Sequence, residues 1–284
     1  MPSSLPIDAS LRDRWIAGED GSFTAELPDG WAQGRSIFGG LSAAYAVALG
    51  RKVADPRRRL RHFGATMMRP MAPGPVSGRV EVLRTGRTTQ FVKARLLQDG
   101  AVALEAGLTY VVPEPVGRVE VEPPAPPPAP PPDGLPGFPP DDPFAPRFLA
   151  NVDVRLAVPN VPFRGGSEAL LDGYCRFRQP FGAEEGIVAL VDIWPCPSLV
   201  LCRGPVPAST VTWSLHLLAD PPERTHDYFR YIYRTFEGHG GFHTAVGTLY
   251  DPAGRAVVHS EQLVAIFDGK DRMRLDGPSG DGGA

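Results

Sequence analysis

Two polar residues interrupt apolar stretches of this sequence at positions where a side chain could do acid–base chemistry. Asp192 is the single acidic residue of the apolar segment 187–194, which belongs to a predicted helix. Burial there would raise the pKa of its carboxyl group toward neutrality, where a carboxylate can act as a general base. The alternative is a capping or ion-paired aspartate, but the C-terminal end of a helix disfavours negative charge. The pattern therefore favours a chemical role for Asp192.

Gln262 directly precedes the apolar run 263–267. Its amide can both donate and accept hydrogen bonds, so it can hold a water molecule beside a base. A hydrogen-bonded glutamine in the core is the alternative. We interpret Gln262 as a second candidate site residue.

Several other groups could take part in binding or catalysis. Gly39 and Gly40 open an alanine-rich segment, and the start of a helix there would leave backbone N–H groups free to bind an anion. The basic run 51–61 could hold phosphates or simply be a solvated loop. Cys196 and Cys202 lie in a proline-rich loop, and no histidine is tied to either by spacing. The cysteines and histidines show no metal-ligand spacing, so we expect no metal and no other cofactor.

The composition limits the classes of protein that this chain can belong to. Its 284 residues carry a formal net charge of -3, which argues against a basic nucleic-acid-binding protein. No window approaches the ~18 uninterrupted apolar residues of a membrane-spanning helix. The N-terminal residues lack the basic and apolar regions of a signal peptide. We expect a cytoplasmic protein.

A proline-rich segment divides the chain into two parts. Residues 113–146 hold 15 of the 33 prolines, which excludes helix and central strand and favours an extended linker. The predicted domains are residues 1–112 and 147–268, and the glycine-rich tail 269–284 is predicted to be disordered.

The two parts share one order of predicted elements: a strand, an apolar helix and four further strands. Setting Gly100 on Gly254 superimposes the last hairpin of each part and places Leu108 opposite Gln262. The fold class predicted from this repeat is α+β, with two tandem units in which an antiparallel sheet wraps a helix, a double hotdog. The predicted helices are 38–54 and 183–194, and the predicted strands are 22–27, 61–68, 76–83, 88–97, 101–112, 169–178, 209–217, 228–235, 242–250 and 256–267.

Three motifs, in order along the chain, carry a resemblance to a known family: residues 31–40 (WAQGRSIFGG), 67–70 (MMRP) and 260–262 (SEQ). With their spacing, they make residues 20–268 resemble the acyl-CoA thioesterase II family, apart from the proline-rich insert. The resemblance implies the double hotdog fold and hydrolysis of an acyl thioester, without a metal or a covalent intermediate.

The resemblance also implies roles for individual residues. It places a catalytic set at Asp192, Thr210 and Gln262. The loop before Thr210 is shorter than the family's, which leaves Thr212 as the alternative hydroxyl under the two-residue period of a strand. Glu261 should lie on the opposite face of its strand and is the less suitable acid. The residues expected to bind substrate, through backbone N–H groups at a helix start or as walls of an acyl pocket, are Phe38, Gly39, Gly40, Trp194 and Trp213.

Two other functions compete with hydrolysis. A hotdog hydratase or dehydratase needs a histidine close to its aspartate, and Pro197 stands where a histidine five residues after Asp192 would fall. A non-catalytic acyl-CoA-binding protein is the second alternative. The expected partner is acyl-CoA, or the thioester of an acyl carrier protein, and exposed sheet edges predict a homodimer or larger homo-oligomer.

Overall fold

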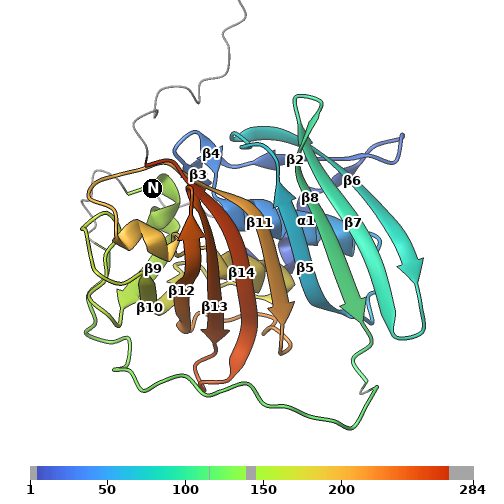
Figure 1. Ribbon diagram of the computed structural model, residues 1–284. Coiled ribbons are helices and arrows are strands. Elements are labelled where there is room, and N and C mark those ends of the chain that lie inside the picture. The colour runs from blue at the N-terminus through green and yellow to red at the C-terminus, as the bar shows by residue number, and fades with distance from the viewer. Residues whose placement is uncertain (1–4, 115, 139–144, 269–284) are drawn as a thin grey trace, which may run out of the picture.

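One antiparallel sheet of 12 strands runs through both halves of the chain (Figure 1). The computed structural model describes residues 5–114, 116–138 and 145–268. The two halves meet where β5 pairs with β11, so each half contributes its strands to one side of the sheet. In their order across the sheet, the strands are β1 (Ile16–Ala17), β2 (Phe23–Leu27), β6 (Gly74–Thr85), β7 (Thr89–Gln98), β8 (Ala101–Val111), β5 (Arg59–Met67), β11 (Ala208–Leu217), β14 (Ala256–Ile266), β13 (Phe242–Tyr250), β12 (Phe229–His239), β10 (Leu170–Phe177) and β9 (Val152–Leu156).

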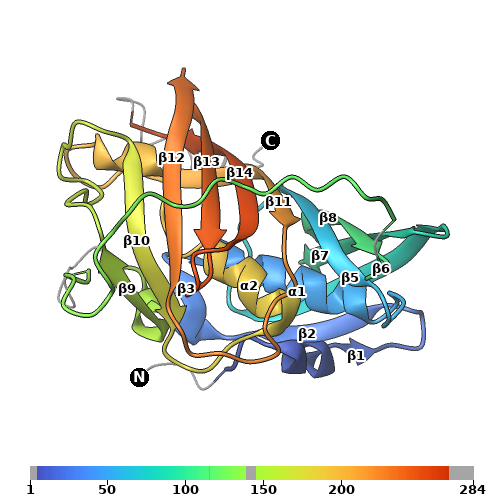
Figure 2. The same ribbon diagram turned by 90° about the horizontal axis from the view of Figure 1, so that it is seen from below.

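Two helices, α1 (Gly39–Arg51) and α2 (Ala183–Val191), lie side by side against the sheet (Figure 2). They run antiparallel, because Gly39 lies beside Asp192 at one end of the pair and Arg51 binds Glu184 at the other. The helices pack closely: a Cβ atom on Gly40 would lie 2.6 Å from the Ala189 carbonyl oxygen. The small residues of α1 permit this approach. Each half is thus a helix wrapped by its part of the sheet, which confirms the predicted double hotdog.

The strand registers bear out the alignment of the two halves. The β5–β11 pairing centres on Gly64 and Ser214, so Phe63 and Trp213 occupy equivalent positions. Phe63 lies opposite Leu108, and Trp213 lies opposite Gln262. Leu108 and Gln262 are therefore equivalent.

The helix ends and several short elements differ from the predictions. Helix α1 ends three residues before the predicted Ala54, and α2 ends at Val191 because Asp192 leaves the helix with φ -94° and ψ 3°. Strand β9 was not predicted. The remaining elements are β3 (Ala32–Gln33), β4 (Ser36–Ile37) and the 3-10 helices η1 (Ala9–Arg14), η2 (Asp29–Trp31), η3 (Arg147–Asn151) and η4 (Pro197–Val200).

The described part of the proline-rich segment forms no helix or strand and runs past the strand ends of the C-terminal half (Figures 1 and 2). It is held there by hydrogen bonds to its carbonyl groups: Arg230 donates to Pro127, and the Tyr174 hydroxyl donates to Pro130 over 2.9 Å. Proline carbonyls remain free to accept because only the N–H is lost. The domain boundaries stay a prediction, and the tail 269–284 lies outside the described residues.

No helix among the described residues is long and apolar enough to span a membrane.

Candidate active site

A cavity of about 270 Å³ opens between the two halves, beside the N-terminus of α1. The N-terminal half lines it with the start of α1, the end of β5 and the loop that follows. The C-terminal half lines it with the loop after α2 and with β11 and β14. The cavity brings together Asp192, Thr210 and Gln262, the three residues implied by the family resemblance.

Asp192 follows the last residue of α2, and its carboxyl group faces the cavity. The Gln262 side chain donates from Nε2 to Asp192 Oδ1 over 2.9 Å, and the Gly40 backbone N–H also donates to this carboxyl group. Burial nevertheless raises the pKa of Asp192 to about 7, because the two hydrogen bonds only partly offset the loss of solvation. A carboxyl group with this pKa can take up and release a proton at neutral pH.

The N-terminus of α1 supplies the electrostatic partner that the sequence did not reveal. Its positive end lies against Asp192 and offsets the unfavourable position of a carboxylate after the C-terminus of α2. Gly39 is required by this contact, since a Cβ atom there would lie 2.7 Å from Asp192 Oδ2. The glycine pair thus lets the helix start approach the carboxyl group.

A β-bulge in β11 separates the two candidate threonines. Thr210 pairs with Val264 and Thr212 with Leu263, so the two threonines face opposite sides of the sheet. Thr210 lines the cavity, whereas Thr212 is exposed on the outer face. The two-residue period fails here because the bulge adds one residue to β11.

Gln262 is buried and hydrogen-bonded at both ends of its amide. The Tyr233 hydroxyl donates to Gln262 Oε1 over 3.0 Å, opposite the end that donates to Asp192. Tyr233 was not predicted as a site residue. Its only signal was the alternation of Tyr231 and Tyr233 within β12, which is also typical of an ordinary buried strand.

The substrate-binding candidates fall into two groups. Gly39 and Trp194 line the cavity. Trp213 is buried opposite Gln262 on the neighbouring strand, where its Nε1 donates to Ser260 Oγ over 3.0 Å. The cavity lining does not include Trp213, Phe38 or Gly40. The Gly40 backbone N–H nevertheless binds Asp192.

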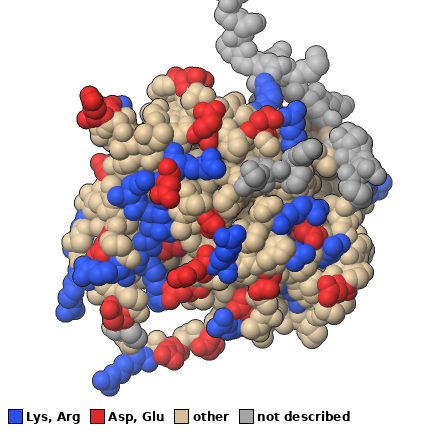
Figure 3. All heavy atoms as spheres, turned by 180° about the vertical axis from the view of Figure 1, so that it is seen from behind, with Lys and Arg blue, Asp and Glu red and all other residues tan. Residues whose placement is uncertain are grey.

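The basic run near the C-terminal end of α1 lies at the other end of the helix pair from this cavity. Four of its arginines bind acidic side chains. Acidic and basic groups also lie next to each other on the face seen in Figure 3. The run therefore provides no phosphate-binding cluster at the cavity. The ion pairs are Arg51–Glu184, Arg57–Asp55, Arg58–Asp55 and Arg59–Asp220.

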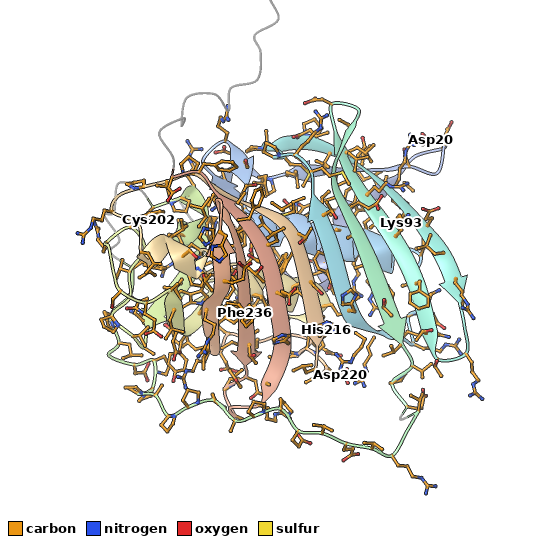
Figure 4. All side chains as sticks on the ribbon, viewed as in Figure 1. Asp20, Lys93, Cys202, His216, Asp220 and Phe236 are labelled. Atoms are coloured by element: carbon orange, nitrogen blue, oxygen red, sulfur yellow. The ribbon has the colours of Figure 1, made fainter. Side chains whose placement is uncertain are left out.

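The described cysteines and histidines form no catalytic pair with each other. Cys196 lines the cavity, but burial raises the pKa of its thiol, which disfavours the reactive thiolate. His243 Nδ1 instead lies 2.9 Å from Ser198 Oγ. His216 lies on β11, well separated from Cys202 (Figure 4). Among the described residues, no group of three His, Cys, Asp or Glu could hold a metal ion.

Two family models match this chain. Residues 27–111 match the acyl-CoA thioesterase N-terminal domain, and residues 123–266 match the acyl-CoA thioesterase C-terminal domain. No curated protein matches the sequence.

Solved structures with the same fold share little sequence with this chain. A hot dog fold protein of unknown function from Alicyclobacillus acidocaldarius has a TM-score of 0.79 at 22% identity, covering 92% of this chain and 98% of its own. A proposed thioesterase II from Thermobifida fusca also has a TM-score of 0.79 at 22% identity, covering 93% and 100%. The acyl-CoA thioesterase II TesB2 from Mycobacterium marinum has a TM-score of 0.72 at 17% identity, covering 92% and 99%. At these identities the likeness shows the fold.

Proposed function

The chain belongs to the acyl-CoA thioesterase family, and from this premise we propose that it hydrolyses an acyl thioester, with Asp192 as the general base. The observation that carries the proposal is the position of the Asp192 carboxyl group. It faces the cavity, has a pKa raised to about 7 by burial, and is bound by Gln262. Among the described residues it forms no ion pair that would hold it permanently charged.

The proposed reaction needs a water molecule between Asp192 and the thioester. Asp192 accepts a proton from this water, while the Thr210 hydroxyl and the second N–H of the Gln262 amide hold its oxygen in place. The water oxygen bonds to the thioester carbonyl carbon, and the carbon–sulfur bond then breaks. The leaving sulfur takes the proton from Asp192, so the products are a carboxylic acid and a free thiol.

Substrate binding would use the other walls of the cavity. We assign the Gly39 N–H to the thioester oxygen, because Gly39 is the first helical residue and lines the cavity, whereas the Gly40 N–H already binds Asp192. Trp194 would form part of the acyl pocket. Arg69, which is exposed and also lines the cavity, would meet the phosphates of a coenzyme A thioester.

The site favours hydrolysis over hydration. A hotdog hydratase needs a histidine beside its aspartate, and the residues that line this cavity include none. We further propose that the enzyme is cytoplasmic and forms a homodimer. The reason for the homodimer is that β1 and β9, the strands at the two edges of the sheet, each lack a partner strand on one side among the described residues.

The test is thiol release from short, medium, long and aromatic acyl-CoAs, and from the matching acyl-pantetheine thioesters, by wild type and Asp192→Asn. We expect turnover that falls by about a thousandfold in Asp192→Asn, because the variant cannot accept the proton. Glu261→Gln is the matched control, since this neighbouring carboxylate is exposed on the outer face. Acyl-CoA binding without turnover by wild type would identify a binding protein instead.

A further inference from the structure

The Gln262 amide can stabilise the Asp192 carboxylate, the form that acts as a base, in only one of its two orientations. With Nε2 toward Asp192, the amide donates to the carboxylate, as the structure has it over 2.9 Å. With the amide rotated by half a turn, Oε1 would face the carboxylate oxygen, and two acceptors would repel each other. Something must therefore hold the donating orientation.

Tyr233 is the side chain placed to do this. It is 1% exposed on β12, and its hydroxyl lies 3.0 Å from Gln262 Oε1. Burial raises the pKa of Tyr233 well above its usual range, so the hydroxyl keeps its proton and can donate. The ring of Tyr231 stacks on it with centroids 5.1 Å apart, which restrains the hydroxyl.

The geometry points to Tyr233 as a positioning residue that fixes the Gln262 amide in the orientation that donates to Asp192. Tyr233 touches neither Asp192 nor the cavity in its hydrogen bonds or in the cavity lining, so its effect passes through Gln262. The inference rests on the proposed function for its kinetic consequence only. The orientation of the amide can be tested without any substrate.

The repeat supports a specific role for this hydroxyl. The strand register places Val80 of the N-terminal half at the position of Tyr233, and Leu108 at the position of Gln262. An apolar residue at each position is thus enough to build the same sheet. Tyrosine and glutamine occur together in the half where an amide must be oriented.

The experiment compares wild type with Tyr233→Phe, which keeps the ring and removes the hydroxyl. We expect kcat at pH 7 to fall about tenfold with KM changed less than twofold. The acidic limb of the kcat profile should move to higher pH, because a less well-held amide stabilises the Asp192 carboxylate less. The titratable groups that interact electrostatically with Asp192 or Tyr233 are Tyr231, Tyr233 and Cys196, and burial raises the pKa of each, so they do not account for this limb.

Two further measurements make the result decisive. Tyr231→Phe, the matched control, removes a buried hydroxyl two residues away and should leave the limb in place. In a Gln262→Ala background, Tyr233→Phe should have no additional effect on the limb. Additive losses, or an equal shift in Tyr231→Phe, would overturn the inference.

The pKa of Asp192, followed by carbon NMR of the labelled carboxyl group, gives a readout without substrate. A higher pKa in Tyr233→Phe than in wild type supports the inference even if no thioester is hydrolysed, in which case only the proposed function fails. An unchanged Asp192 pKa together with an active wild type would overturn the inference and keep the proposed function.

Discussion

At one end of the helix pair the Asp192 carboxyl group faces a cavity and has an amide as its side-chain partner, while at the other end Glu184 binds Arg51. Asp192 lies between the C-terminus of α2 and the N-terminus of α1, and Glu184 lies in the first turn of α2 beside the C-terminus of α1. The repeat makes these two ends of the helix pair equivalent. At the second end, Glu184 Oε1 also accepts the Leu60 N–H over 2.6 Å, so this carboxylate is fully engaged. Each carboxyl group accepts a backbone N–H, but only Glu184 also has an ion-pair partner among the described residues, and the lack of one leaves Asp192 available for chemistry.

The same difference extends into the sheet. The β-bulge of β11 has an equivalent in β5, where Leu60 takes the position of Thr210. The polar side chains Thr210, Gln262 and Tyr233 thus replace Leu60, Leu108 and Val80 on one scaffold. The shared backbone provides two equivalent places for a site, and a few polar side chains determine which of them is the candidate active site.

Among variants that exchange residues between the two halves, the largest effect is expected from Gln262→Leu, which gives the second half the residue of the first. The variant removes the donor to Asp192 and one group that holds water, so kcat/KM should fall by about 10² to 10³. Steady-state hydrolysis of the best acyl-CoA measures this. The reciprocal change Leu108→Gln should produce no activity in an Asp192→Asn background. Recovery of activity in that double variant would break the comparison between the two ends.

The buried Asp192 carboxyl group should also lower the stability of the fold when it is charged, whereas the ion-paired Glu184 should not. The folded-state pKa of Asp192, about 7, lies above the ordinary value of 3.8 for an aspartic acid in an unfolded chain. The folded protein therefore binds the proton more tightly than the unfolded chain does. The resulting contribution to the free energy of unfolding is complete below pH 3.8 and is lost as the pH rises toward 7. The total is no more than about 4 kcal/mol.

Asp192→Asn, which is neutral at every pH, should accordingly be more stable than wild type at pH 8, with the gap narrowing toward pH 5. Urea unfolding at the two pH values checks this. A gap that does not change with pH would show that burial does not raise the pKa of Asp192.

Much of the architecture could be predicted because it depends on local patterns. Turn glycines and apolar runs located ten strands of the sheet, and the alignment of Gly100 with Gly254 gave the pairing of Leu108 with Gln262. Asp192 stood out because a single charge in an apolar segment is conspicuous. Strand β9 was missed because it is short and only the five residues of η3 separate it from the proline-rich segment.

The partners of Asp192 could not be predicted, since they depend on distances between elements far apart in the sequence. Gly40 meets Asp192 across the helix pair, and Tyr233 meets Gln262 across β13. A tyrosine in a buried strand gives no sign of what its hydroxyl will reach. The two tryptophans predicted as walls of the acyl pocket differ for the same reason: Trp194 lines the cavity, whereas Trp213 is buried in the core.

The smallest effect is expected from the threonine pair, and it tests the bulge directly. Thr210→Val keeps the shape of the side chain but removes the hydroxyl from the cavity, so kcat should fall about tenfold. Thr212→Val makes the same change on the outer face and should leave kcat within about twofold of wild type. If Thr212→Val caused the larger loss in the acyl-CoA assay, β11 would follow the two-residue period that the bulge interrupts. Strand β5 would then have a bulge at Leu60 that β11 lacks. Leu60 and Thr210 would no longer occupy equivalent positions in the two halves.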